Sequence, residues 1–392
     1  MKAGLKMFSL SGSSTFNVTS LSSSAATSTF PSIQSLSSSF SPISPLTADS
    51  LRIRPASSIG FPIFSGGRRS LCSASASMSG NGSPSSSSQE GSDSFFRSVL
   101  ENVESVYLSR NPTAKSILEL VQSADGGERI CYDHLAFRTF GVDGHGIDSM
   151  ASFFLDYGYK QMEELRFPAK KLKALWFSPP PSVSAANGGS RIHGPLPRVF
   201  ISELLVDQMS PQAQEIIRKY VEISSSGYKY AALASALGTL TWKKPMHSEF
   251  QQLARESEYA AWTLVNGYAL NHVTISTHRL KSNLSQINSL NRFIEENGFK
   301  LNSEGGLLKV SPDGLLLQSS TVADSMPFRF SDGAVEPVPC SYIEFAERLV
   351  LPQYKNLPND EVKEFHRRDG FEVGNADKIF ESTSQEQVTR AA

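Results

Sequence analysis

The stretch CYDHLAFRTFG, from Cys131 to Gly141, combines the marks of a buried strand with two residues that a buried strand rarely carries. Side chains in a strand point alternately to its two faces. His134 and Arg138 therefore share one face, whereas Leu135 and Phe137 share the other. The apolar face belongs to a core, so the function of this strand depends on what the face with His134 and Arg138 contacts.

The organisation around this strand occurs twice in the chain. After the first strand, the sequence predicts an amphipathic helix that ends at a Gly-Tyr-Lys triplet, and residues 271–300 show the same order, with a histidine on an apolar strand, a helix and a Gly-Phe-Lys triplet. Strands are predicted after the two helices at 160–167, 172–178, 198–207, 306–310, 315–322 and 340–350. Because order and spacing recur, we predict two βαβββ modules.

The fold class is therefore α+β, in one folded domain at 95–383. Asn111 and Pro112 mark the start of a second N-terminal helix, as N-cap and first helical residue. The predicted parts are N-terminal helices at 95–123, module one at 128–207, a helical insert at 210–265, module two at 268–348, a closing segment at 349–383 and a tail at 384–392.

The first ninety residues differ in composition from the rest. They are rich in Ser and Thr, and Asp49 is the only acidic residue before Glu90. This composition is typical of an organelle transit peptide, and the scarcity of early arginines favours a plastid. We predict a disordered transit peptide at 1–80 and a low-complexity linker at 81–94, which places the protein in the stroma of a chloroplast or amyloplast. The alternative is a disordered tail without a targeting role.

Composition limits the class of protein. The 392 residues are 39% hydrophobic and 19% charged, with a formal net charge of −1. These values fit a soluble globular protein and argue against nucleic acid as a partner. The three cysteines lie far apart and form no CxxC pair, which argues against a thiolate zinc site and a disulfide framework. No apolar run is long enough to predict a membrane segment.

Two histidines and one acid form the candidate site. His134 and His272 occupy equivalent places on the first strands of the modules, so both should face the centre of the paired modules. Glu344 lies between two apolar residues of a predicted strand, and a carboxylate there is costly to bury unless it is paired or bound to metal. Two imidazoles and one carboxylate form the facial arrangement that holds Fe(II) and leaves positions open for substrate and O₂.

Each of these residues also has a simpler interpretation. A histidine in a strand is often a hydrogen-bonded core residue, and Glu344 could pair with Arg348. The repetition of the histidine at one module position favours the metal site. Glu203 is predicted to hold in module one the position that Glu344 holds in module two, so it is a candidate fourth ligand or a residue that supports the ligands.

Arg138 lies on the same strand face as His134, four residues further along. A guanidinium beside a metal pocket suits a substrate carboxylate, because it can donate two parallel hydrogen bonds to it. The alternative is an ion pair with a structural acid such as Glu203 or Glu344.

With the repeat and this residue set in view, the sequence resembles the vicinal-oxygen-chelate superfamily. More closely, it is similar to the 2-oxoadipate dioxygenase/decarboxylase family, in the plant plastid form of the floury-endosperm type. The motifs that carry the resemblance are YDHLAFRTFG, FISELLVD, NHVTIS, YIEFAER and GFEVGNADKIFEST. The resemblance covers about residues 95–383, and it implies that both modules build one curved sheet or partial barrel with surrounding helices. It also implies iron ligands at His134, His272 and Glu344, and a substrate-carboxylate arginine at Arg138.

The resemblance further implies an Fe(II)-dependent enzyme that converts 2-oxoadipate and O₂ to D-2-hydroxyglutarate and CO₂ in lysine catabolism. Its binding partner would be a small 2-oxo dicarboxylic acid. Two other functions stay open. One is a metal-dependent isomerase or lyase of the glyoxalase kind, which commonly uses a fourth ligand. Metal binding by Glu203 would favour this function over the dioxygenase. The other is a non-catalytic plastid regulatory protein of starch storage tissue.

Overall fold

The computed structural model describes residues 86–127, 129–181, 189–222 and 227–391. The predicted transit peptide at 1–80 lies outside these residues. The linker predicted at 81–94 is helical from Ser86 on, because helix α1 spans Ser86–Arg110 and begins well before the expected start at Phe95. Asp93 accepts a hydrogen bond from Arg97 Nε at 2.9 Å, one turn along, and such pairs extend a helix toward its N-terminus.

Module one has the predicted order. Its elements are β1 (Tyr132–Phe140), α3 (Ile147–Asp156), β2 (Lys160–Phe167), β3 (Leu172–Ser178) and β4 (Arg198–Leu204). Helix α2 (Pro112–Ala124) precedes the module, and the side chain of Asn111 caps it by accepting a hydrogen bond from the amide of Ala114. Gly158, the predicted stop of α3, has a φ of +82°, which ends the helix because few other residues adopt this conformation readily.

Module two repeats this order with one addition. Its elements are β5 (Leu270–Ser276), α8 (Ile287–Glu296), β6 (Lys309–Val310), β7 (Leu316–Ser320) and β10 (Tyr342–Arg348). Between β7 and β10 the chain forms a separate hairpin of β8 (Ser325–Arg329) and β9 (Val335–Pro339). This hairpin was not predicted from the sequence. Its prolines argue against strands in a larger sheet, but a two-stranded hairpin consists only of edges, where proline is tolerated.

The insert between the modules and the closing segment also contain helices. The insert between the modules contains α4 (Pro211–Val221), α5 (Gly227–Leu237), α6 (His247–Glu256) and α7 (Glu258–Asn266). The closing segment contains α9 (Val373–Ile379) and a 3₁₀ turn at Phe380–Thr383. The tail predicted at 384–392 is not a free end, because Gln385–Ala391 form α10 and the side chain of Gln387 is buried.

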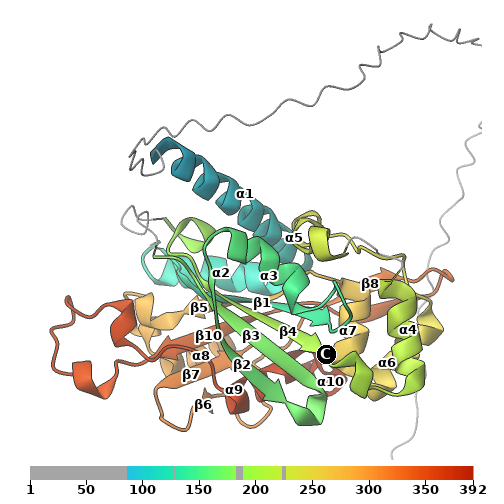
Figure 1. Ribbon diagram of the computed structural model, residues 1–392. Helices are drawn as coiled ribbons and strands as arrows, with labels where there is room; N and C mark the ends of the chain where they lie inside the picture. Colours follow the sequence, from blue (N-terminus) through green and yellow to red (C-terminus); the bar gives the residue numbers. More distant parts are fainter. Residues whose placement is uncertain (1–85, 128, 182–188, 223–226, 392) are drawn as a thin grey trace, which may run out of the picture. The chain divides into compact units, whose positions relative to one another are not determined.

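The eight strands of the two modules form one curled sheet in the order β2-β3-β4-β1-β5-β10-β7-β6 (Figure 1). The modules meet where β1 and β5 pair antiparallel. Each of these first strands also pairs parallel with the last strand of its own module, β1 with β4 and β5 with β10. The four central strands thus place the two predicted histidines and Glu344 on neighbouring strands.

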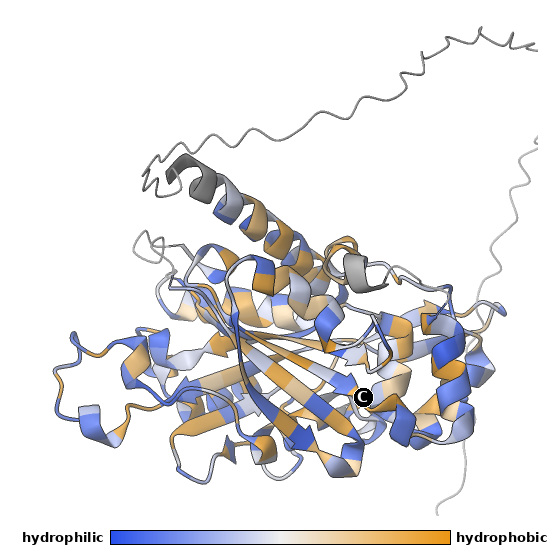
Figure 2. Ribbon diagram, viewed as in Figure 1, coloured by the Kyte–Doolittle hydropathy of each residue, from blue (hydrophilic) through white to orange (hydrophobic). Residues whose placement is uncertain are grey.

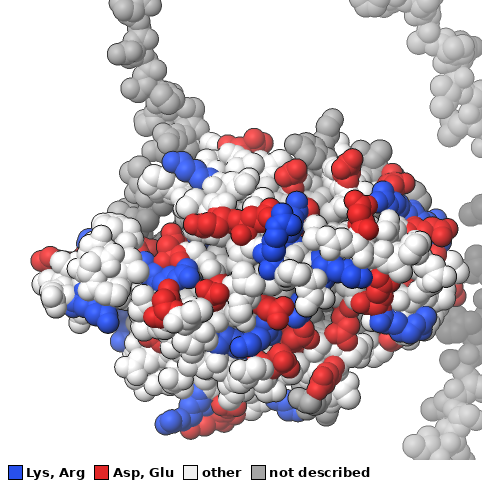
Figure 3. Space-filling model, turned by 60° about the horizontal axis from the view of Figure 1, so that its bottom comes forward, with Lys and Arg blue, Asp and Glu red and all other residues white. Residues whose placement is uncertain are grey.

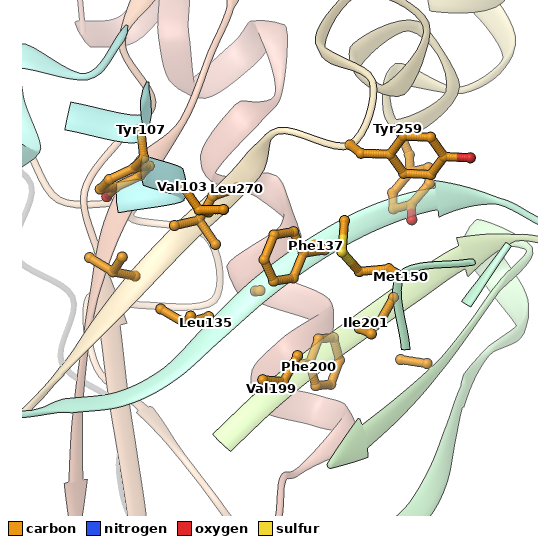
Figure 4. Packing of buried hydrophobic residues seen from close by; sticks show 14 of the residues in the cluster. Val103, Tyr107, Leu135, Phe137, Met150, Val199, Phe200, Ile201, Tyr259 and Leu270 are labelled. Carbon is orange, nitrogen blue, oxygen red and sulfur yellow. The ribbon is translucent and has the colours of Figure 1, made fainter. Parts of the chain in front are cut away.

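The two faces of this sheet differ in chemistry, and the alternation is visible as bands of colour along the strands in Figure 2. The apolar face packs against helices that include α1, α2 and α3, which lie together on one side of the sheet in Figure 1. Figure 4 shows Leu135, Phe137, Val199 and Ile201 of β1 and β4 in this core, with residues of α1 and α3. The opposite face carries the polar residues of the candidate site.

Acidic and basic side chains are interspersed on the face shown in Figure 3, in keeping with the formal net charge of −1. Among the helices of the described residues, none has both the length and the apolar character that crossing a bilayer requires.

Two neighbouring phenylalanines of α1, one buried and one exposed, allow the packing of this helix to be tested. Phe96 is 1% exposed and stacks on Phe153 and Tyr157 with ring centroids 5.3 and 4.7 Å apart, whereas Phe95 is 59% exposed. We expect Phe96→Ala to lower the free energy of unfolding by about 3 to 5 kcal/mol in urea denaturation. Phe95→Ala is the matched control and should change it by no more than about 0.5 kcal/mol. Equal losses would show that α1 does not pack through Phe96.

Candidate metal centre

His134, His272 and Glu344 converge on the polar face of the sheet, as the sequence predicts. The Nε2 atoms of the two histidines lie 3.4 Å apart, and Oε2 of Glu344 lies 3.0 Å from Nε2 of His272 and 3.6 Å from Nε2 of His134. All three side chains are buried. Ligands about 2.1 Å from one ion and about 90 to 110° apart are separated by roughly 3.0 to 3.4 Å. The cluster therefore fits a divalent metal ion.

The residue before each histidine orients its ring. Nδ1 of His134 lies 2.8 Å from Oδ1 of Asp133, and Nδ1 of His272 lies 2.9 Å from Oδ1 of Asn271. Both oxygens accept a hydrogen bond, so each Nδ1 carries the proton and each Nε2 is free to bind metal. In the sequence an acid or an amide precedes each of the two histidines, and no role was predicted for it. That recurrence was the available signal.

Asp133 is held by a buried ion pair. Arg348 donates to it from Nε at 2.6 Å and from Nη2 at 2.9 Å, and Arg198 lies 3.4 Å away. Burial alone would raise the pKa of Asp133, but the two guanidinium groups outweigh burial and hold the pKa well below its usual range. Because Arg348 pairs with Asp133, the alternative in which Glu344 pairs with Arg348 is wrong.

The electrostatics of the cluster favour a bound cation, because Glu344 is ionised. Burial opposes ionisation, but His134 and His272 lower the pKa of Glu344 to about 2. Burial is also the main reason why the pKa of His272 falls to about 4, so this imidazole is neutral and can act as a ligand. The carboxylates of Glu344 and Asp133 raise the pKa of His134 despite its burial. A metal ion between His134, His272 and Glu344 would replace the additional proton that this raised pKa favours on His134.

Glu203 does not hold the position predicted for it. Ala136 of β1 pairs with Phe200, whereas the equivalent Thr274 of β5 pairs with Glu344, so Phe200 is the counterpart of Glu344. Glu203 instead accepts a hydrogen bond from the amide of Ile147 at 2.8 Å and pairs with Lys173 at 2.9 Å.

Its counterpart in module two is Glu347, which accepts a hydrogen bond from the amide of Ile287 at 2.9 Å. Glu203 and Glu347 thus each cap the module helix, α3 or α8, at its N-terminus. The prediction missed this because it aligned the two last strands by their acids rather than by their register.

Arg138 is fully buried and has no carboxylate partner within ion-pair distance among the described residues. Its Nη1 donates to Thr383 Oγ1 at 3.0 Å and its Nη2 to the carbonyl of Phe380 at 3.3 Å, while Nε has no hydrogen-bond partner. The guanidinium also lies 5.1 and 5.0 Å from the ring centroids of Tyr259 and Trp262. Burial lowers the pKa of Arg138, and the predicted ion pairs with Glu203 or Glu344 are not formed.

The closing segment forms one wall of the metal centre. A cavity of about 20 Å³ lies against His134, His272 and Glu344, with room for about one water molecule. Its apolar lining includes Phe371 and Phe380 of the closing segment, and the ring of Phe371 meets that of His134 edge-on with centroids 4.8 Å apart. The sequence analysis assigned no role to these phenylalanines, because no local pattern connects them with strands far away in the chain.

Comparisons with known proteins agree with this geometry. The sequence model of the 2-oxoadipate dioxygenase/decarboxylase family matches residues 98–362. The chain is 70% identical over 328 residues to a chloroplastic 2-oxoadipate dioxygenase/decarboxylase of Arabidopsis thaliana, which covers 84% of this chain and 86% of the relative.

Solved structures are similar as well. The crystal structure of hydroxyglutarate synthase from Oryza sativa in complex with 2-oxoadipate has a TM-score of 0.76 and 68% identity, and the match covers 80% of this chain and 100% of that chain. A putative glyoxalase superfamily protein from Ralstonia eutropha has a TM-score of 0.50 at 18% identity, over 71% of this chain and 86% of that chain. The second likeness concerns the fold alone, and it agrees with the predicted α+β fold of two βαβββ modules in one curved sheet.

The ligand assignment can be tested with Co(II), whose binding is visible by absorption. His272→Ala should abolish stoichiometric Co(II) binding, because a metal held by three protein ligands rarely stays in place on two. Glu203→Gln is the control and should bind Co(II) like the wild type, although it loses the ion pair with Lys173 and should melt at a lower temperature. Full occupancy in His272→Ala, or loss of metal in Glu203→Gln, would contradict the assignment.

Proposed function

This chain belongs to the 2-oxoadipate dioxygenase/decarboxylase family, and from that premise we propose that it converts 2-oxoadipate and O₂ to D-2-hydroxyglutarate and CO₂ with Fe(II) held by His134, His272 and Glu344. The observation that carries the proposal is a buried His/His/Glu cluster together with a buried arginine that has no acidic partner among the described residues and lines a second cavity, which shares Phe380 with the cavity at the cluster. The metal would be Fe(II), because two histidines and one carboxylate with open positions are the ligands of non-haem iron oxygenases. The pathway that we assign to this reaction is lysine breakdown.

The balance of the reaction defines what the protein must do. One carbon of the substrate leaves as CO₂, one oxygen atom of O₂ enters the new carboxylate, and the other becomes the hydroxyl group of the shortened chain. Fe(II), when bound, supplies the activation of O₂ and an anchor for the 2-oxo acid. The protein has to hold both ends of the substrate, so that only one carbon is presented for hydroxylation, and to exclude water.

The residues around the cluster suit these tasks. Asp133 and Asn271 hold the protons on Nδ1 of the two histidines, so Nε2 of each ring stays available. Arg138 would bind a substrate carboxylate with two parallel hydrogen bonds. The carboxylate would compensate the charge of the guanidinium group, which is buried without an acidic partner among the described residues. The apolar wall of Phe200, Phe371 and Phe380 excludes water from the reacting end.

The glyoxalase-like alternative commonly uses a fourth ligand. Glu203, the residue predicted to discriminate it, is engaged by Lys173 and by the amide of Ile147. This arrangement favours the O₂-dependent reaction. A non-catalytic role in the plastid does not account for the retention of three ligands together with Arg138.

Substitutions of Arg138 distinguish these functions experimentally. We expect Arg138→Ala to keep its iron and to lose kcat/KM for 2-oxoadipate by roughly a hundredfold to several thousandfold, since a buried charge-assisted pair is lost. Arg138→Lys should recover only part of the activity, because an ammonium group cannot make the planar two-point contact. Iron content, melting temperature and O₂ uptake are measured on one preparation.

Wild-type turnover in Arg138→Ala would exclude the clamp. Absence of O₂ uptake by the wild-type protein with any 2-oxo dicarboxylic acid would exclude the dioxygenase.

The plastid assignment rests on the composition of residues 1–80 and on the chloroplastic relative. A fluorescent protein fused behind residues 1–80 should enter plastids in leaf cells, whereas a fusion that carries the chain from residue 81 on should stay in the cytosol. Imaging both fusions beside a plastid marker measures this. Cytosolic fluorescence of the first fusion would contradict the predicted transit peptide.

A further inference from the structure

Two amide side chains connect the metal ligand Glu344 with the closing segment. Gln318 of β7 donates from Nε2 to Oε1 of Glu344 at 2.7 Å, and Asn375 of α9 donates from Nδ2 to Oε1 of Gln318 at 3.0 Å. All three side chains are buried. The chain of hydrogen bonds therefore runs from a metal ligand in the sheet to a helix that closes over it.

Backbone carbonyl groups determine the direction of this relay. Nδ2 of Asn375 also donates to the carbonyl oxygens of Leu316 at 3.3 Å and Lys309 at 3.5 Å. A carbonyl oxygen only accepts hydrogen bonds, so Asn375 must place its NH₂ group there. Gln318 then turns its oxygen toward Asn375, which leaves its NH₂ group for Glu344. Without Asn375, Oε1 of Gln318 would lose this donor, and the amide of Gln318 would be held only by its bond to Glu344.

The relay selects which oxygen of Glu344 faces the histidines. Oε1 is engaged by Gln318, and Oε2 is the atom that lies 3.0 Å from Nε2 of His272. A hydrogen bond to an ionised oxygen is strong in a buried site. Glu344 is therefore held so that one oxygen is offered to the metal, which leaves the other positions of the ion to substrate and O₂.

We propose that Gln318 and Asn375 are positioning residues, which set the metal affinity of the site by fixing the orientation of Glu344. The inference rests on the proposed metal site, and it assigns to the closing segment a role in ligand geometry besides its role as a wall. Without the hydrogen bond from Asn375, Gln318 loses the partner that fixes its amide, and Glu344 is held less firmly in one orientation.

Asn302 provides a matched control. Like Asn375, it is a buried asparagine that anchors the closing segment, through Nδ2 bonds to the carbonyl of Lys378 at 2.9 Å and to Oγ of Ser382 at 3.0 Å. Its side chain makes no hydrogen bond to Gln318 or Glu344 in the part of the chain that the structure describes. Replacing it loosens the same segment without touching the relay.

The test compares Asn375→Leu, Asn302→Leu and Gln318→Met. The affinity for Co(II) is measured anaerobically by competition with a chelator, together with the visible spectrum of bound Co(II) and the melting temperature. Asn375→Leu and Gln318→Met should weaken Co(II) binding roughly 10- to 100-fold and change the spectrum. Asn302→Leu should lower the melting temperature as Asn375→Leu does, yet keep Co(II) affinity within about twofold of wild type. The double variant Q318M/N375L should bind no more weakly than Gln318→Met alone, because both changes interrupt one relay.

Equal effects of Asn375→Leu and Asn302→Leu on Co(II) affinity, or wild-type affinity in Gln318→Met, would overturn the inference. If a leucine variant does not fold, the pair Asn375→Ala and Asn302→Ala gives the same comparison, since alanine leaves space that water can fill. Neither substrate nor O₂ is present, so this result is independent of the proposed reaction. A wild-type protein that binds Co(II) but, with Fe(II), does not turn over 2-oxoadipate would overturn the proposed function and leave the relay intact.

Discussion

The metal centre depends on the buried ion pair between Asp133 and Arg348. A carboxylate without a partner in this place would be costly, whereas two short hydrogen bonds to a guanidinium make it stable as an anion. The pair orients His134, and the same guanidinium donates from Nη1 to the carbonyl of Gly370 at 2.8 Å, where the closing segment begins its path over the site. It also lies 5.6 Å from the ring centroid of Phe371. One ion pair thus joins ligand orientation to the wall of the cavity.

Two similar modules build a site that is not symmetric. The acids Glu203 and Glu347 cap the equivalent helices of the two modules, so this contact is part of the structural repeat. The ligand positions differ, because Glu344 of module two corresponds to Phe200 of module one. For the proposed function, a second carboxylate at Phe200 would fill a position that the substrate needs. The asymmetry therefore gives a candidate metal site with three ligands, in which one module supplies the acid and the other supplies an apolar wall.

Local patterns predicted the modules and the three converging residues, because strand alternation and helical spacing repeat within short windows of sequence. The same patterns failed where distant residues decide the structure. The position predicted for Glu203 was wrong, because the register of β4 with β1 cannot be inferred from the motif alone. The hairpin of β8 and β9 was missed because its prolines argue against strands. Gln318 and Asn375 were also missed, because an amide in a predicted strand gives no sign that its partner lies on a helix of the closing segment.

Charge balance explains why a dicarboxylic acid suits this site. Asp133 and Arg348 compensate each other, so the groups that remain at the proposed site are a divalent metal ion, the anionic Glu344 and the cationic Arg138. Together they carry a net charge of about +2, which a buried site cannot hold without compensation. A 2-oxo acid with two carboxylates carries the opposite charge. If one carboxylate binds beside the metal and the other pairs with Arg138, the substrate neutralises the site when it binds. A monocarboxylic acid would leave one positive charge buried, so discrimination against it arises from electrostatics as well as from shape.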